Sequence, residues 1–431
     1  MISIEEAIAT IFQHACALSA RSRPLLDALG CRLAEDVAAD ADQPPFDKAL
    51  VDGYAIRVEE SDAGRRRFRI GETILAGQVP THDLQSGEAA VIMTGAPTPG
   101  RTNAVVMHEQ TTTEGPEVWI DLDPVKPEHN LLRQGRICKA GDLLLSRGEI
   151  LTPPRLALLA SVGRPSVQVI PRVEAAILST GDELVEPDQT PGPGQIRNSN
   201  TIMLEALARS AGASTKPFPI VPDDPAPLRR AFVEGLESDV MLITGGVSAG
   251  QRDLVPSILS ELDVERKFHK IRLKPGKPLW FGVGPRRGDR PGTLVFGLPG
   301  NPISGLVGFL LFVKPAMRIL EGHAAQPTEL LKARLGRDFQ QKGDRVAYHP
   351  ARWAREPGLG VIEPLRSAGS ADLWSIAPAD GFAAFPAGDR LFREGEIALP
   401  TGHWPGNGGR CPPYADFELN EPRKRKPRRI A

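Results

Sequence analysis

The stretch that most constrains the fold is a continuous apolar run at residues 240–243, which is followed by Thr244, Gly245 and Gly246. Such a run is typical of a strand that is buried on both faces of a parallel sheet. The glycines let the backbone turn sharply and approach a ligand closely, where a Cβ would intrude. Residues 254–262 then have the apolar spacing of a helix. A strand, a glycine turn and a helix N-terminus together predict an anion site at the carboxyl end of the sheet, although a plain tight turn is the alternative for this stretch alone.

Two other stretches repeat this arrangement. Residues 175–179 form an apolar strand that ends in a Ser-Thr-Gly turn carrying Glu183. Residues 294–298 run into the sequence Pro-Gly-Asn-Pro, in which we expect Asn301 to cap a helix that begins at Pro302. Three strand ends thus offer hydroxyl groups, bare backbone and carboxylates to a ligand.

A fourth segment supplies positive charge, because Lys270, Lys274 and Lys277 surround a Pro-Gly turn. Lysines neutralise phosphate as point charges, and oxygen ligands such as Glu183 and Asp253 suit Mg²⁺. This set of groups fits a phosphorylated substrate that is bound with a divalent cation. Two alternatives stay open: Lys270 and Lys274 could form the solvated face of a strand, and Asp253 could cap the helix that follows it.

Composition excludes several classes of protein. The chain has 431 residues, enough for several domains, and its net charge of −1 gives no bulk field for nucleic acid or a membrane surface. Its four cysteines lie far apart and form no metal-ligand spacing. The acidic N-terminus does not resemble a secretory signal, and Lys314-Pro315 cuts short the best candidate for a membrane span, which begins at Leu306. We therefore expect a cytoplasmic protein without membrane contact, and we do not expect nucleic-acid binding.

The pattern along the chain changes twice. Short alternating runs broken by glycine and proline predict a β-rich inserted domain over residues 46–136. From about residue 171 strands alternate with helices, which implies βαβ units. The helices are expected at residues 201–210, 227–236, 254–262 and 303–320. The predicted fold class is α/β: a central α/β domain with a mostly parallel sheet, an inserted β-rich domain, a small N-terminal linking domain and a C-terminal β domain.

The motifs STGDEL, TGGVSAG, KIRLKPGKP and GLPGNP resemble, in order, those of the molybdopterin molybdenumtransferase family, to which the gephyrin E domain belongs. Upstream, PPFDKALVDGYA and VIMTGAP are similar to the two N-terminal signatures of the family. The resemblance covers roughly residues 1–400. It implies an enzyme of molybdenum-cofactor biosynthesis that inserts molybdate into adenylylated molybdopterin and releases AMP. It also implies Mg²⁺ as cofactor, molybdate as substrate and a homodimer.

The resemblance also implies domain boundaries and the roles of individual residues. The expected domains are a discontinuous linking domain (1–43 and 137–170), the inserted domain (44–136), the molybdopterin-binding α/β domain (171–324), the C-terminal β domain (325–403) and a disordered basic tail (404–431). Catalytic roles are implied for Glu183, Asp223, Asp253, Lys270 and Lys274, with Glu183 and Asp253 as the metal ligands. Substrate binding is implied for Thr180, Gly181, Gly245, Gly246, Ser248, Lys277, Pro299, Gly300, Asn301, Pro302, Arg345, Ser370, Asp52 and Thr94.

This sequence departs from the family pattern near the inserted domain. The family's Gly-Glu-Asp-Ile is replaced here by Gly135-Arg136-Ile137-Cys138, so Ile137 takes the place of a carboxylate and Arg136 adds positive charge beside it. Asn103 stands where the family commonly has Asp. Two alternatives to the active enzyme therefore stay open: a non-catalytic paralogue that binds molybdopterin or a nucleotide, and a scaffold protein. The intact α/β motifs favour the enzyme.

Overall fold

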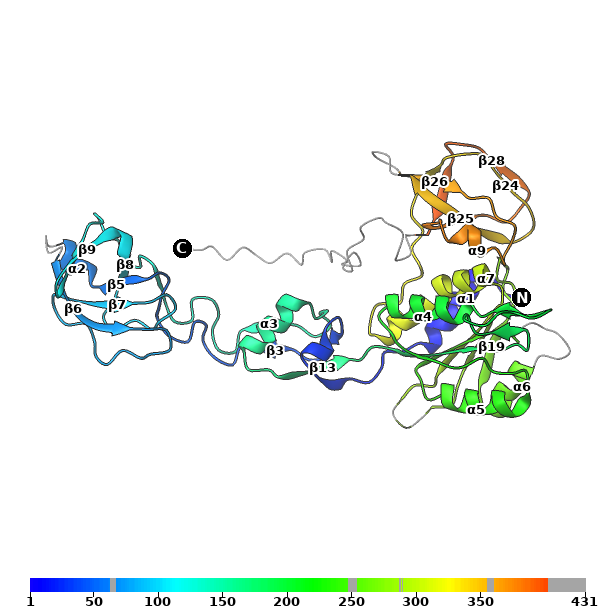
Figure 1. Cartoon of the computed structure of the whole chain (residues 1–431), viewed down its shortest axis with the longest axis horizontal. Coiled ribbons are helices and arrows are strands. Elements are labelled where there is room, and N and C mark those ends of the chain that lie inside the picture. The colour runs from blue at the N-terminus through cyan, green and yellow to red at the C-terminus, as the bar shows by residue number, and fades with distance from the viewer. Residues whose placement is uncertain (63–66, 247–253, 287, 289, 355–359, 402–431) are drawn as a thin grey trace. The chain divides into compact units, whose positions relative to one another are not determined.

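The computed structural model describes residues 1–62, 67–246, 254–286, 288, 290–354 and 360–401 (Figure 1). The chain divides into two compact units, Met1–Ala20 with Ile170–Ala431, and Arg21–Val169. The predicted basic tail lies outside the described residues. The predicted domain boundaries stay predictions, and each unit is described below by itself.

The first unit is built around a six-stranded sheet with the strand order β17-β14-β18-β22-β21-β19. The strands are β14 (Glu174–Ser179), β17 (Ser214–Pro217), β18 (Val240–Thr244), β19 (Glu265–His269), β21 (Trp280–Val283) and β22 (Leu294–Leu298). The first four strands in this order are mutually parallel, and β21 runs antiparallel to both β22 and β19. All residues of β18 and β22 are buried. The predicted, mostly parallel sheet is therefore confirmed, and its central strands are buried on both faces.

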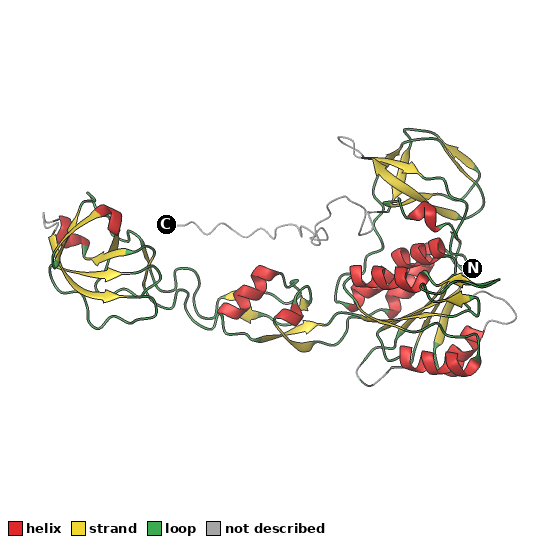
Figure 2. Ribbon diagram, in the orientation of Figure 1, coloured by secondary structure: helices red, strands yellow, loops and turns green. Residues whose placement is uncertain are grey.

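Helices cover both faces of this sheet (Figure 2). They are α1 (Ile4–His14), α4 (Asn200–Ser210), α5 (Pro225–Gly235), α6 (Leu254–Glu261), α7 (Pro302–Gly308), the π-helical segment η3 (Phe309–Val313) and α8 (Lys314–Leu320). Because side chains alternate along a strand, Ile177 and Leu242 pack in the core with α1, α4 and α7, whereas Leu178 and Ile243 pack with α5 and α6. Short strands β15 (Leu184–Val185) and β16 (Ile196–Arg197) pair beside the sheet.

The helix predicted at residues 303–320 is continuous from Pro302 to Leu320. Its π-helical segment, Phe309–Val313, widens the turn just before Pro315, which would otherwise clash with the preceding turn. The prediction that Lys314-Pro315 cuts this segment short is therefore wrong. By length and composition it is the one helix among the described residues that could cross a membrane, but 89% of its apolar window is buried inside the protein, as in a core helix.

The first unit contains a second six-stranded sheet, formed mostly by its C-terminal strands. Its order is β20-β25-β26-β23-β29-β27, with a further β25–β27 pairing. Its strands are β20 (Leu273–Lys274), β23 (Ala333–Leu335), β25 (Val346–Ala354), β26 (Val361–Pro364), β27 (Gly381–Phe385) and β29 (Ile397–Pro400). Strand β24 (Phe339–Gln341) pairs with β28 (Arg390–Phe392), and α9 (Leu373–Ile376) lies between β26 and β27 in sequence. Strand β20 comes from the lysine segment, so this segment is part of the C-terminal sheet.

The second unit is β-rich, as predicted for most of its length. Its largest sheet has the order β8-β5-β7-β6-β10-β9. These strands are β5 (Gly53–Ile56), β6 (Arg67–Ile74), β7 (Glu88–Ile92), β8 (Ala104–Met107), β9 (Thr111–Glu114) and β10 (Glu117–Ile120). The remaining elements are β1 (Arg21–Pro24), η1 (Leu26–Ala28), β2 (Arg32–Leu33), β3 (Val37–Ala38), β4 (Lys48–Ala49), α2 (Val58–Asp62), η2 (His108–Gln110), β11 (Leu131–Leu132), β12 (Leu143–Leu145), α3 (Pro153–Ser161) and β13 (Ser166–Ile170).

Candidate active site

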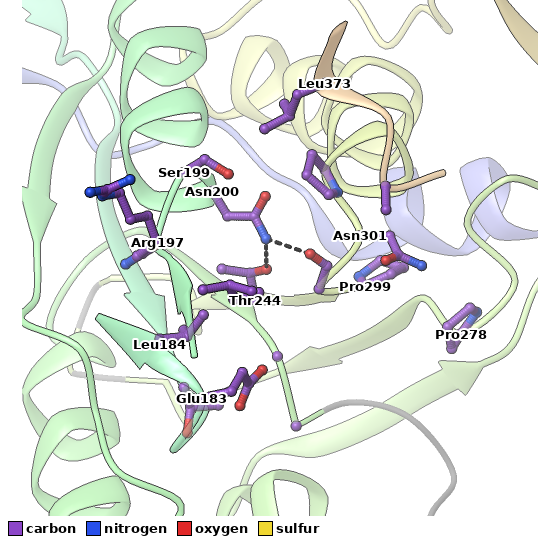
Figure 3. A pocket seen from close by; sticks show the side chains of 18 residues that line it. Glu183, Leu184, Arg197, Ser199, Asn200, Thr244, Pro278, Pro299, Asn301 and Leu373 are labelled. Atoms are coloured by element: carbon purple, nitrogen blue, oxygen red, sulfur yellow. Dashed lines mark hydrogen bonds between the residues drawn. The ribbon is translucent and has the colours of Figure 1, made fainter. Parts of the chain in front are cut away.

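A cavity of about 650 Å³ opens at the carboxyl ends of β14, β18 and β22 (Figure 3). Parallel strands bring the turns that follow them to this same edge, which is where α/β proteins bind ligands. We call it the larger cavity, because a second, smaller one is described below. The predicted site residues that line it are Thr180, Glu183, Gly245, Gly246, Pro299, Gly300, Asn301 and Pro302. The structure thus gathers the three predicted turns at one place.

The glycine turn after β18 requires glycine for two reasons. Gly245 has a φ of +92°, a left-handed conformation that other residues rarely adopt. A Cβ on Gly245 would also lie 2.1 Å from the carbonyl oxygen of Thr180. The backbone N–H of Thr180 donates to the carbonyl of Thr244 at 3.0 Å, so the turns after β14 and β18 are in direct contact. Gly245 is therefore held at the wall of the cavity by a turn that only glycine fits.

Asp223 lies beside the turn that follows β14, rather than on the cavity itself. The hydroxyl of Thr180 donates to the carboxylate of Asp223, and the backbone N–H of Asp223 donates to Asp182 Oδ1 at 3.1 Å. Glu183 is exposed and lines the cavity. A Cβ on Gly181 would lie 2.5 Å from Glu183 Oε2, so glycine at this position leaves room for the carboxylate.

Asn301 occupies the predicted N-cap position of α7, but its side chain does not cap the helix. Its Nδ2 donates instead to the hydroxyl of Ser370 at 3.0 Å, and the N–H of Ile303 donates to the carbonyl of Ser370 at 3.0 Å. Capping by the Asn301 side chain is therefore a wrong prediction, because a partner 69 residues away in sequence takes its amide. Ser370 is joined to the Pro-Gly-Asn-Pro loop by these two bonds.

A smaller cavity of about 350 Å³ lies on the Ser370 side of this contact, and Lys274 and Ser370 are among its lining residues. Lys274 is exposed, and its Nζ donates to the carbonyl of Lys342 at 3.0 Å. Arg345 lines neither the larger nor the smaller cavity. Its Nη1 donates to the carbonyl of Leu273 at 2.9 Å, so its guanidinium contacts the backbone next to Lys274.

Lys270 and Lys277 also line neither cavity, although both are among the described residues. Lys270 has a φ of +77°, and β19 ends one residue before it. Its N–H donates to the carbonyl of Leu279 at 2.9 Å. The interpretation of Lys270 and Lys274 as one solvated strand face is therefore wrong, because a positive φ takes the backbone out of the extended region.

His349, which no sequence motif marks, lines the smaller cavity. Its Nε2 lies 2.6 Å from the carbonyl oxygen of Leu365, which can only accept, so Nε2 carries the proton. Burial lowers the pKa of His349 below its usual value, the positive charges of Arg337 and Lys274 act in the same direction, and the bond to Leu365 opposes them. The ring is therefore mainly neutral at pH 7. Because His349 is an isolated histidine in a strand, no residue spacing in the sequence predicts that it lines this cavity.

The predicted metal ligands are only partly described. Asp253 and Ser248 lie outside the described residues. Glu183 is the only carboxylate among the described residues of the larger cavity, and the described part of the chain holds no cluster of three or more His, Cys, Asp or Glu residues that could bind a metal ion. Mg²⁺ commonly takes one or two carboxylates together with substrate phosphates and water. Glu183 fits such a site as one ligand.

Comparison with known proteins decides the family. Residues 2–163 match the family model of the MoeA N-terminal region (domains I and II), residues 176–319 a probable molybdopterin-binding domain, and residues 332–399 the MoeA C-terminal region (domain IV). The molybdopterin molybdenumtransferase of Staphylococcus aureus strain Mu50 is 33% identical over 399 residues, which cover 91% of this chain and 94% of that protein. The chain belongs to the molybdopterin molybdenumtransferase family.

Other relatives agree with this assignment. The molybdopterin molybdenumtransferase of Staphylococcus epidermidis strain RP62A is 33% identical over 402 residues, which cover 92% of this chain and 94% of that protein. Two solved structures of the molybdopterin biosynthesis MoeA protein from Pyrococcus horikoshii are 31% and 29% identical, with TM-scores of 0.75 and 0.68. They cover 93% and 94% of this chain and 99% and 100% of their own. The predicted family, enzyme class and fold class are confirmed.

The second unit holds the two residues that carry the N-terminal signatures of the molybdopterin molybdenumtransferase family. Asp52 precedes β5 and Thr94 follows β7, and Gly53 pairs with Ile92 in the antiparallel register of these strands. The N–H and the hydroxyl of Thr94 both donate to Asp52 Oδ1 at 2.6 Å. These bonds, the hydroxyl bond foremost, hold the pKa of Asp52 below its usual value. The carboxylate of Asp52 is exposed and ionised at neutral pH.

The departures from the molybdopterin molybdenumtransferase family pattern lie at the surface of the second unit. The side chain of Ile137 is 69% exposed, and Arg136 is also exposed. The N–H of Ile137 donates to the carbonyl of Gln43 at 2.8 Å, so the backbone there is part of a local pairing. Asn103 is half-buried: its Oδ1 accepts from the N–H of Val58 at 2.8 Å, and its Nδ2 donates to Glu59 Oε1 at 2.8 Å. A carboxylate at this position could make only the first of these two bonds.

Proposed function

We propose that this chain inserts molybdate into adenylylated molybdopterin, with cleavage of the phosphoanhydride and release of AMP. One observation carries the proposal: two cavities of different chemistry adjoin each other across the bond between Asn301 and Ser370. The larger cavity offers bare backbone and the Glu183 carboxylate, and the smaller one offers the Lys274 ammonium. A reaction that joins a large organic phosphate to a small oxyanion needs two such adjacent places.

The larger cavity suits the adenylylated molybdopterin. Its volume of about 650 Å³ is in the range of sites for small organic molecules. Gly245, Gly246 and Gly300 let phosphate groups approach the backbone without interference from a Cβ. The hydroxyl of Thr180 and the carboxylate of Asp223 are bonded to each other beside the turn, so Asp223 orients the turn rather than binding the substrate directly. This arrangement supports the predicted role of Thr180, Gly245 and Gly300 in substrate binding.

The smaller cavity suits molybdate, a tetrahedral dianion. Lys274 provides an exposed ammonium and Ser370 a hydroxyl, both of which donate to oxyanions. The neutral ring of His349 adds no positive charge to this cavity, so charge recognition depends on the two lysines that line it, Lys274 and Lys342. We assign Arg345 an indirect role, because its guanidinium holds the carbonyl of Leu273 next to Lys274.

We further propose Mg²⁺ as the cofactor, with Glu183 and Asp253 as its ligands. When bound, Mg²⁺ would neutralise charge on the pyrophosphate and stabilise the departing AMP. The protein itself then has to bind both substrates, orient molybdate through Lys274 and Ser370, and hold oxyanion charge at the glycine turn. No protein nucleophile is required, because water can cleave the phosphoanhydride to give AMP and the phosphate of molybdopterin, with release of a proton.

The homodimer and the substrate-binding roles of Asp52 and Thr94 belong to the same proposal and rest on the family resemblance. The cytoplasmic location also belongs to it and rests on the sequence composition. Light scattering tests the dimer, and a monomer at micromolar concentration would contradict it. The names of the curated relatives favour the enzyme over the non-catalytic paralogue and the scaffold protein.

The test is release of AMP when the purified protein is mixed with adenylylated molybdopterin, molybdate and Mg²⁺. We expect Glu183→Gln to lower turnover by about 10- to 100-fold at limiting Mg²⁺. Glu186→Gln is the matched control, since Glu186 is an exposed carboxylate three residues away that does not line the larger cavity. No AMP release by the unaltered protein would overturn the proposed activity, and rescue of an inactive protein by Arg136→Glu with Ile137→Asp would identify a degenerate paralogue.

A further inference from the structure

Asn200, the first residue of α4, bridges two of the turns that line the larger cavity (Figure 3). Its Nδ2 donates to the hydroxyl of Thr244 at 3.0 Å and to the carbonyl of Gly300 at 2.7 Å. A carbonyl oxygen can only accept, so the atom that faces Gly300 has to be the amide nitrogen. One amide group therefore connects the end of β18 to the loop that follows β22.

These two turns approach each other closely. A Cβ on Gly300 would lie 4.0 Å from the Cα of Gly245, within van der Waals distance. Because glycine has no side chain, neither residue keeps the two backbones apart, and the distance between them depends on groups outside the turns. The Asn200 amide is such a group, and it contacts both turns at once.

The side-chain carbonyl oxygen of Asn200 indicates that a contribution to stability does not by itself explain why asparagine occupies this position. Asn200 Oδ1 is buried and has no hydrogen-bond partner among the described residues. A buried acceptor without a donor costs free energy. A side chain present only to stabilise the fold would be expected to satisfy both ends of its amide, and a functional role is one explanation for a buried polar atom without a partner.

We infer that Asn200 is a positioning residue for the proposed transfer reaction. It holds the Gly245 turn and the Gly300 loop at the spacing that fits the adenylylated substrate, and it acts through these two backbone segments rather than on the reacting atoms. The inference rests on the proposed function for the identity of the ligand. It adds a residue to which the family motifs assign no role here.

The test is the affinity for AMP, the proposed product, measured by isothermal titration calorimetry with the full chain. We expect Asn200→Ala to raise the Kd for AMP about tenfold or more, and to raise KM for the adenylylated substrate more than it lowers kcat. Thr244→Val removes one of the two bonds and should give a smaller loss. The variant that combines Asn200→Ala with Thr244→Val should bind AMP no more weakly than Asn200→Ala alone, because the Thr244 hydroxyl acts through Asn200.

Thr293→Val is the matched control. The buried hydroxyl of Thr293 lies 2.7 and 2.8 Å from the carbonyl oxygens of Leu236 and Ser238, to either of which it can donate, next to the amino ends of β22 and β18. Its loss should lower the melting temperature and leave the Kd for AMP within twofold of the unaltered protein. A positioning role for Asn200 is overturned if Asn200→Ala binds AMP as tightly as the unaltered protein, or if Thr293→Val loses as much affinity.

The outcomes also separate this inference from the proposed function. If the unaltered protein binds AMP but does not turn over, the proposed activity fails while the affinity comparison still decides the role of Asn200. If the unaltered protein does not bind AMP at all, both are overturned. Should Asn200→Ala fail to fold, Thr244→Val and its comparison with Thr293→Val give the decision.

Discussion

Lys274 is an exposed cation that lines the smaller cavity, and its Nζ donates to the backbone carbonyl of Lys342, which leaves its charge available to a ligand. We predict that Lys274→Ala lowers the affinity for molybdate by up to about fivefold at low salt, since an exposed charge contributes about 1 kcal/mol or less. The loss should shrink in about 0.5 M salt, because screening removes most of the advantage of the unaltered protein. Calorimetric titration with molybdate at both salt concentrations measures this.

Lys216→Ala is the control for this prediction. Lys216 forms a 3.0 Å ion pair with Glu234 and lines neither cavity, so its removal changes the net charge equally without altering the site. Equal molybdate affinity in the unaltered protein and in Lys274→Ala at low salt would remove Lys274 from the proposed site.

His349 is expected to make stability depend on pH. The pKa of its ring is lowered in the folded protein, chiefly by burial. Below the ordinary value of about 6.5, the unfolded chain therefore binds a proton that the folded ring does not. The stabilisation is complete above pH 6.5 and is lost as the pH falls towards the folded pKa. We predict that the free energy of unfolding, measured by urea denaturation, falls less between pH 7.5 and about 5.5 in His349→Gln than in the unaltered protein. Parallel profiles for the two proteins would contradict this assignment.

At the scale of elements, the turn after β18 has a backbone conformation that we expect only glycine to fit at position 245. We predict that Gly245→Ala lowers the free energy of unfolding by about 3 kcal/mol or more, because a left-handed alanine costs about 1–2 kcal/mol and its Cβ would also clash with the Thr180 carbonyl 2.1 Å away. AMP affinity should fall as well, since the turn has to move. Chemical denaturation and calorimetry measure the two effects.

Gly212→Ala separates the two costs. Gly212 has a φ of +98°, but the nearest atom to an added Cβ is 3.8 Å away. This variant should lose only the cost of the left-handed conformation, about 1–2 kcal/mol, and keep its AMP affinity. Similar losses in both variants would show that the contact with Thr180 relaxes and that the turn is not rigid.

The whole molecule raises the question of which parts fold alone. The unit Arg21–Val169 has hydrophobic clusters of its own, one around Leu33 and Leu159 and another around Phe68 and Val106. We predict that a fragment of residues 21–169 folds cooperatively, because it does not depend on the core of the other unit for burial of its apolar residues. A sigmoidal thermal transition in circular dichroism and dispersed NMR amide signals are the expected results. A fragment without either would show that the unit Arg21–Val169 does not fold independently of the rest of the chain.

Much of the fold was predictable from local patterns. The buried strand at residues 240–243, the glycines after it and the alternation of strands with helices depend on residues that are neighbours in sequence. They correctly predicted a mostly parallel sheet, and a cavity lies at the edge where the site is expected. The family motifs are of the same kind, because each is a short run at one strand end. Asn301 shows where local reasoning ends: its position at the start of α7 was predictable, but the use of its amide was not.

The sequence alone therefore determined the family, the fold class and which turns line the larger cavity. Only the tertiary structure decided that the Asn200 amide donates to a carbonyl 100 residues away and that Ser370 bonds to the Pro-Gly-Asn-Pro loop. It also decided that Lys270 and Lys277 line neither cavity, whereas His349 lines the smaller one. The physical reason is that hydrogen bonds and burial between distant segments depend on how the sheets pack together. Such packing leaves no periodicity or spacing in the sequence from which these contacts could be read.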